Sequence, residues 1–72
     1  MEHKKLIAKS FKEKINNIEK NKKLADFNWD SLTKITLITD IHKIFNKNLD
    51  YTKFDKIKTF EQLNKLIEKT VK

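Results

Sequence analysis

The sequence contains no cysteine, glycine, proline or arginine. Without cysteine, disulfide bridges and thiolate metal sites are excluded, so the apolar core alone must stabilise the fold. Without glycine and proline the usual turn signals are missing, and segment ends must be inferred from helix caps and breaks in the hydrophobic pattern. Without arginine the chain lacks the bidentate side chain that most often contacts guanine, so base-specific recognition of nucleic acid is not expected.

Long apolar runs are also missing. No stretch approaches the length of a membrane span, and residues 1–20 lack the continuous apolar segment of a secretory signal. We therefore expect no membrane span and a cytoplasmic protein. A chain of 72 residues has room for one domain, residues 1–72, with a small core. We expect a monomer of modest stability.

Lysine is abundant, and the formal net charge is +7. Residues 1–23 carry eight lysines against three acids, whereas residues 24–72 carry nine lysines against seven acids. A basic chain suggests nucleic acid or an anionic membrane as a partner. A basic helical module that binds one of these through the lysine-rich first segment is therefore an alternative function for this protein, although we expect no nucleic-acid partner.

The hydrophobic spacing predicts helices. Apolar residues at spacings of four, four and three predict an amphipathic helix over residues 2–20, which would bury Ile7, Phe11, Ile15 and Ile18. A coiled coil is the competing interpretation, although the stripe lasts barely two heptads. The periodicity lapses over residues 20–30, which predicts a long loop with a few apolar plugs.

A central helix is predicted from Leu32 to Phe45, with Ser31 as its N-cap. Its apolar residues cover more than one stripe, so we expect it to pack against neighbours on two sides. These residues are Leu32, Ile35, Leu37, Ile38, Ile41, Ile44 and Phe45.

The last third of the chain predicts a loop and then a helix. Residues 46–58 favour a loop that contains one short helical turn. Thr59 followed by Gln62 has the spacing of a capping box, which predicts a helix over residues 60–70. The apolar face of that helix comprises Phe60, Leu63, Leu66, Ile67 and Thr70 or Val71. The whole chain is predicted to be an all-α bundle of three main helices plus one short helix.

The sequence does not favour catalysis. His3 is expected in a fraying tail, and His42 has only Asp40 near it on its helix, facing elsewhere, so neither histidine is expected to bind a metal. Ser31 has no neighbouring base to activate it, and a core this small leaves little room for a cleft. We therefore expect no enzymatic activity.

The string Trp29-Asp30-Ser31-Leu32 presents a serine at a helix start, behind a long loop. It resembles the acyl carrier and peptidyl carrier proteins, which have an Asp-Ser-Leu tripeptide at the start of their second helix. The resemblance extends without a gap over about residues 5–70. It includes Ile35, Leu37, Ile38, Ile41, Phe45, Leu49, Ile57, Thr59, Leu63 and Ile67.

The resemblance implies a four-helix carrier fold with a 4′-phosphopantetheine arm on Ser31, which carries acyl or aminoacyl groups as thioesters. It implies that Asp30 helps to position the loading enzyme and its magnesium ion, and that Leu32 lodges in the core and directs the serine outward. The implied partners are a phosphopantetheinyl transferase, a loading ligase and downstream transferases. A helix N-terminus also favours the phosphate that this modification adds.

Other interpretations of these residues remain open. Ser31 is also interpreted as an ordinary N-cap, with Asp30 placed favourably beside the positive end of the helix dipole. The chain would then be an unmodified relative that serves as a protein-interaction subunit. Trp29 is interpreted either as a plug that closes the loop against the bundle or as a contact for the arm.

The outward face of the predicted central helix departs from the carrier pattern. Carriers of fatty acid synthesis usually present an acidic helix here, whereas these positions are almost neutral in sum. They are Thr33, Thr36, Thr39, Asp40, His42 and Lys43, and Lys34 adds another positive charge near Ser31. Because complementary charge guides such encounters, we expect partners with neutral or acidic docking surfaces and a specialised pathway rather than housekeeping fatty acid synthesis.

Overall fold

The computed structural model describes residues 2–72 and contains six helical segments. They are α1 (Lys4–Phe11), η1 (Ile15–Asn17), η2 (Leu24–Asp26), α2 (Ser31–Phe45), η3 (Tyr51–Lys56) and α3 (Phe60–Val71), where η marks a 3-10 helix. Residues 2–72 form no strand, only an isolated antiparallel bridge between Lys23 and Thr59. The predicted all-α bundle, with a short helix between the second and last main helices, is confirmed.

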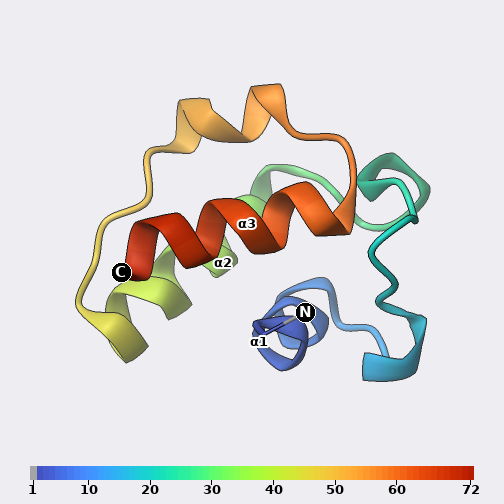
Figure 1. Cartoon of the computed structure of the whole chain (residues 1–72), viewed down its shortest axis with the longest axis horizontal. Coiled ribbons are helices and arrows are strands. Elements are labelled where there is room, and N and C mark those ends of the chain that lie inside the picture. Colours follow the sequence, from blue (N-terminus) through green and yellow to red (C-terminus); the bar gives the residue numbers. More distant parts are fainter. Residues whose placement is uncertain (1) are drawn as a thin grey trace.

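The helices stack around one core (Figure 1). In this view α3 lies in front of α2, and both run toward the side of the molecule where the C-terminus lies, whereas α1 is seen nearly end-on. Helix α2 contacts both α1 and η3. Its buried residues, Thr33, Leu37 and Ile41, form a single stripe, so less of its apolar surface is covered than predicted. No helix in the part of the chain that the structure describes combines the length and hydrophobicity needed to cross a membrane.

The core draws on every one of the main helices and on the loops between them. Its fully buried side chains are Ile7, Phe11, Ile18, Leu24, Leu37, Ile41, Phe54, Phe60, Leu63 and Ile67. Burying a side chain of this size contributes about 1.5–3 kcal/mol relative to leaving it exposed. With no disulfide available, these side chains supply the main favourable term for folding.

The first helix is shorter than the predicted 2–20, because α1 ends at Phe11. Lys12 adopts the left-handed conformation (φ 56°, ψ 39°). The amide of Glu13 then donates to the carbonyl of Ala8 at 2.9 Å, which closes the helix with a Schellman-type turn. A glycine usually takes this position, so a lysine there left no signal in the sequence.

The predicted apolar stripe of the first helix is therefore divided between two segments. Ile7 is buried on α1, but Ile15 lies on η1 and is 42% exposed. Ile18 is again fully buried, from the loop after η1. A helix of eight residues offers about one heptad, so the coiled-coil interpretation of residues 2–20 is wrong.

The N-terminal segment is tied to the bundle, and the expectation that His3 lies in a fraying tail is wrong. The backbone N–H of His3 donates to Asn64 Oδ1 of α3 at 2.9 Å. The ring of His3 packs edge-on against Phe45 of α2, with ring centroids 5.9 Å apart. Residue 3 therefore contacts both of the other main helices.

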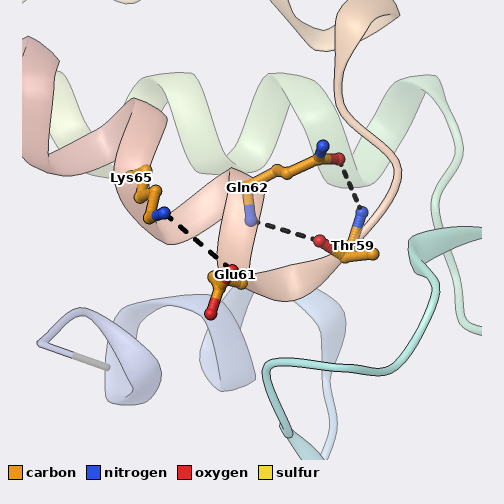
Figure 2. Close-up of polar contacts among 4 residues, drawn as sticks. All are labelled: Thr59, Glu61, Gln62 and Lys65. Atoms are coloured by element: carbon orange, nitrogen blue, oxygen red, sulfur yellow. Dashed lines mark hydrogen bonds and ion pairs between the residues drawn. The ribbon is translucent and has the colours of Figure 1, made fainter.

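Helix α3 begins where the capping box predicted it (Figure 2). Thr59 Oγ1 accepts from the Gln62 amide at 3.3 Å, and Gln62 Oε1 accepts from the Thr59 amide at 3.2 Å. Gln62 Oε1 also accepts from the Lys58 amide at 2.6 Å. The exposed pair of Glu61 and Lys65, 3.9 Å apart, lies on the next turn.

The predicted short turn within residues 46–58 is η3. Asp50 caps it, since Asp50 Oδ1 accepts from the Thr52 amide at 3.0 Å. Phe54 anchors η3 in the core. The predicted loop before α2 is also found, with η2 as its one helical turn.

Backbone hydrogen bonds join the loop before α2 to the start of α3. The Leu24 amide donates to the Lys58 carbonyl at 2.8 Å, and the Phe60 amide donates to the Lys22 carbonyl at 3.2 Å. These bonds fix the loop that leads to Ser31 against the segment that leads into α3.

Candidate functional site

Asp30, rather than Ser31, is the N-cap of α2. The backbone of Asp30 is extended (φ −112°, ψ 179°), and its Oδ1 accepts from the Thr33 amide at 2.9 Å. Ser31 is consequently the first residue of the helix, which begins one residue earlier than the predicted start at Leu32. Both residue types are good N-caps, so composition alone did not decide between them. The capping role falls to Asp30, which leaves the hydroxyl of Ser31 exposed and uninvolved in the cap.

The carboxylate of Asp30 is stabilised in its charged form. The amide of Thr33, and then its hydroxyl, hydrogen bond to this carboxylate and lower the pKa of Asp30 below its ordinary value. A negative charge at this position also suits the positive end of the α2 dipole. At neutral pH, the residue directly before Ser31 is therefore an anion.

The hydroxyl of Ser31 contacts Tyr51, which in turn contacts Lys34. Tyr51 Oη, from η3, donates to Ser31 Oγ at 3.4 Å. Lys34 Nζ lies 5.3 Å from the ring centroid of Trp29 and 5.7 Å from that of Tyr51, so it is positioned by two cation–π contacts. Lys34 is one turn after Ser31 and shares its face of α2. Tyr51 was missed by sequence reasoning, because it lies twenty residues later on an element with no motif.

Leu32 does not lodge in the core. Its side chain is 68% exposed, so it does not hold Ser31 outward as the resemblance implied. Leu37 and Ile41 form the buried apolar face of α2 instead. Ile35, one turn after Leu32, is 53% exposed. Leu32 and Ile35 thus place an apolar surface beside Ser31 that the packing of the bundle does not use.

The threonines of α2 divide between core and surface. Thr33 is only 5% exposed and does not face outward, so its side chain is not available to a partner. Thr36 is half-buried and its hydroxyl donates to the Leu32 carbonyl at 2.8 Å. Thr39 is exposed, and its hydroxyl donates to the Ile35 carbonyl at 2.9 Å. Both hydroxyls are occupied by the backbone of their own helix.

The charged residues expected on the outer face of α2 lie there only in part. Lys43 and His42 are exposed, and His42 Nδ1 is 3.0 Å from Asn48 Oδ1. Lys34 is half-buried against the rings described above. Asp40 is half-buried as well, and its Oδ2 is buried without a hydrogen-bond partner among the described residues. The accessible part of this face is therefore basic rather than neutral.

Trp29 acts as a plug. Its ring stacks on Phe11 with centroids 5.3 Å apart and meets Phe54 edge-on at 5.1 Å. The residue is half-buried and packs against the core. This tie to α1 and η3 sets the direction in which the chain enters α2.

No protein-family model, curated protein or solved structure matches this chain. The site must therefore be judged from its own residues. Within residues 2–72 there is no group of three histidine, cysteine or acidic side chains placed to hold a metal ion.

The arrangement around Ser31 suits a hydroxyl that accepts a group from another protein. Ser31 is exposed, and within the described residues its Oγ hydrogen bonds only to Tyr51. The neighbouring Asp30 carboxylate is bonded to Thr33 and not to the serine. Among the described residues, no acidic or histidine side chain is bonded to this hydroxyl to act as its base.

Proposed function

We propose that this protein is a carrier, which holds acyl or aminoacyl groups as thioesters on a 4′-phosphopantetheine arm attached to Ser31. The observation that carries the proposal is the position of Ser31. Its hydroxyl is exposed at the first residue of α2, directly after the Asp30 cap and inside the Asp-Ser-Leu tripeptide. A transferase can approach such a hydroxyl from outside without opening the bundle.

The surroundings of Ser31 fit the phosphate of that arm. A helix N-terminus directs amide dipoles toward an anion bound there. Lys34 supplies a positive charge on the same helix face, held by the rings of Trp29 and Tyr51. The hydroxyl of Tyr51, now 3.4 Å from Ser31 Oγ, is positioned to donate to a phosphate oxygen. These groups offset the repulsion from the Asp30 carboxylate.

The attachment step is chemically balanced with coenzyme A as donor. The oxygen of Ser31 forms a bond to the phosphorus nearest the pantetheine, the pyrophosphate bond breaks, and adenosine 3′,5′-bisphosphate leaves. The transferase accepts the serine proton, and Asp30 is positioned to contact that enzyme and its magnesium ion. When attached, the arm supplies a terminal thiol for thioester chemistry, which a chain without cysteine otherwise lacks.

The outer face of α2 supports docking of the enzymes that visit the arm. Leu32 and Ile35 offer apolar contacts beside Ser31, and an exposed apolar patch at such a place is typical of an interaction surface. Thr39, His42 and Lys43 extend this face toward the end of the helix. A partner with an apolar anchor and neutral or acidic surroundings fits it best.

This docking face favours a specialised pathway over housekeeping fatty acid synthesis. The partners we propose are a phosphopantetheinyl transferase, a ligase that loads the acyl or aminoacyl group, and downstream transferases. We propose that the carrier works as a monomer, which leaves α2 accessible to these partners, and that it works in the cytoplasm.

Labelling with a fluorescent coenzyme A analogue tests the proposal. A broad-specificity phosphopantetheinyl transferase should transfer the fluorescent arm to the wild-type chain, and Ser31→Ala should abolish the label. Ser10→Ala is the matched control, because Ser10 is the other serine of the sequence and is buried, with its hydroxyl donating to the Leu6 carbonyl at 3.1 Å. This variant should be labelled at the wild-type rate.

The proposal is contradicted if no transferase labels the folded chain, or if Ser31→Ala is labelled as well as wild type. Circular dichroism should show the same helical content for all three proteins. Loss of label in Ser31→Ala then reports the missing hydroxyl rather than a missing fold.

A further inference from the structure

A groove lies between the loop before α2 and the segment that leads into α3. Leu24, Ala25 and Trp29 form one wall and Ile57 forms the other, with Lys23 and Lys58 at the rim. We call it the Trp29 groove. Its volume is ≈ 550 Å³, within the range of about 300–1,000 Å³ that small-molecule sites occupy.

The two walls are held in place without a ligand. The Leu24 amide donates to the Lys58 carbonyl at 2.8 Å, and an antiparallel bridge pairs Lys23 with Thr59. The ring of Trp29 is held in place by stacking on the ring of Phe11. Because little has to be ordered when a ligand enters, the Trp29 groove is preorganised for binding.

The rim of the groove carries positive charge that nothing in the described chain neutralises. Lys23 and Lys58 are exposed, both line the groove, and neither forms an ion pair within residues 2–72. No carboxylate lines the groove. A bound anion would pair with these ammonium groups while its apolar part covers the walls.

We infer that the Trp29 groove binds a small carboxylate that carries an apolar chain or ring. The apolar part contacts Trp29 and Ile57, and the carboxylate lies between the ammonium groups of Lys23 and Lys58. The lysine stems line the groove while their charged ends reach the rim. This site shares Trp29 with the surroundings of Ser31, but its binding of a carboxylate does not depend on the proposed modification of Ser31.

Tryptophan fluorescence tests the inference directly, since Trp29 is the only tryptophan of the chain. Octanoate is the probe, with 1-octanol as an uncharged molecule of the same chain length and acetate as the same anion without the chain. Octanoate should cause a saturable change in emission. Octanol should bind more weakly, and acetate should cause no saturable change at the same concentrations.

Two double variants separate the rim lysines from general charge. Lys23→Gln with Lys58→Gln should weaken octanoate binding about three- to tenfold, as expected for two exposed ion pairs, and leave octanol unchanged. Lys47→Gln with Lys53→Gln removes the same charge from exposed positions outside the groove and should bind octanoate nearly as wild type does.

A third variant tests the location. Ala25 is exposed and lines the groove, so Ala25→Phe should fill the space without disturbing the core and should abolish the octanoate response. In ¹H–¹⁵N spectra, octanoate should shift the amides of residues 23–29 and 57–59.

Four results would overturn the inference. The first is no saturable response to octanoate, and the second is equal affinity for octanoate and octanol. The third is equal loss of affinity in the two lysine double variants, and the fourth is a set of amide shifts confined to another part of the molecule. Each protein should first show the wild-type thermal unfolding midpoint within a few degrees, so that a misfolded variant is recognised.

Discussion

At the scale of single residues, the four positions 29–32 differ in what holds them. Trp29 is fixed by aromatic contacts, and Asp30 by its hydrogen bond to Thr33. Ser31 has one long hydrogen bond, to Tyr51, and Leu32 is largely exposed. Contacts within the fold therefore account for the positions of the first two side chains, whereas the last two are held by few contacts among the described residues.

Leu32 and Leu37 should respond differently to truncation. Leu32→Ala should change the free energy of unfolding by less than about 0.5 kcal/mol, because the side chain is exposed. It should slow transfer of the phosphopantetheine arm by about fivefold or more, as loss of an interface anchor does. Leu37→Ala removes a fully buried side chain and should cost about 2–5 kcal/mol. Urea unfolding and labelling rates measure both, and a large loss of stability in Leu32→Ala would contradict the exposed position.

Asp30 makes the stability of the fold sensitive to acid. Its pKa is lower in the folded chain than its ordinary value of 3.8, chiefly through the Thr33 amide. Its contribution is therefore present above the unfolded pKa and is lost as the pH falls through the folded pKa, because the unfolded chain binds the proton more readily. The urea midpoint should fall between about pH 5 and pH 2.

Asp30→Asn keeps a capping side chain but removes this titration, so its urea midpoint should depend less on pH over the same interval. The pKa values of Asp50 and Glu68 are also lowered, by the Thr52 amide and by Lys72 respectively, so part of the acid dependence should remain. An unchanged pH profile in Asp30→Asn would contradict the role of this carboxylate.

At the scale of the elements, the sequence predicted helices best where a cap has its own signature. Thr59 and Gln62 form the capping box that the spacing indicated, and α3 runs from Phe60 to Val71 as expected within one residue. Helix α2 was predicted as well, because its apolar residues continue without a break to Phe45.

The errors at this scale have physical causes. Helix α1 ends at Phe11 because Lys12 takes a left-handed conformation for which the sequence contains no glycine signal. The exposure of Leu32 was not predictable, because the apolar residues of α2 surround most of the helix and the pattern does not show which side is buried. The contact between Tyr51 and Ser31 depends on how η3 lies over α2, which local spacing does not encode.

The capping box should account for a measurable share of stability. Thr59→Ala leaves the Gln62 amide without its partner and should destabilise the fold by about 1 kcal/mol. Lys65→Gln is the comparison, because it removes the exposed ion pair with Glu61 at 3.9 Å without altering the first turn of α3, and it should have a much smaller effect. Thermal unfolding of the two variants measures the difference, and equal effects would speak against the box.

Lys12 should be replaceable by glycine with a gain in stability. The left-handed conformation is unfavourable for a residue with a Cβ atom, so Lys12→Gly should stabilise the fold by about 0.5–1 kcal/mol after the added entropy of the unfolded chain. Lys14 has an extended backbone (φ −69°, ψ 141°), so Lys14→Gly should destabilise the fold. Urea midpoints test both, and destabilisation by Lys12→Gly would contradict the turn that ends α1.

At the scale of the whole molecule, the positive net charge affects which partner surfaces can dock on this protein. The net charge of the chain is +7. The accessible end of the α2 face bears His42 and Lys43, and no acidic residue of α2 is exposed. A partner with a basic docking patch is repelled, while a neutral or acidic one is not. The repulsion acts through exposed charges and is therefore screened by salt.

Salt should consequently change binding in the direction opposite to that of an acidic carrier. With a fatty acid synthase enzyme that has a basic docking patch, affinity should be low at low ionic strength and should stay equal or rise as salt is added. Titration calorimetry over a range of salt concentrations measures this. Tight binding at low salt that weakens as salt rises would contradict the predicted docking surface.

The proposed attachment at Ser31 is tested by the mass of the intact protein after incubation with coenzyme A and a phosphopantetheinyl transferase. We expect a single added phosphopantetheine, localised by fragmentation to Ser31. An unchanged mass with every transferase tried, or an addition at any other residue, would contradict it.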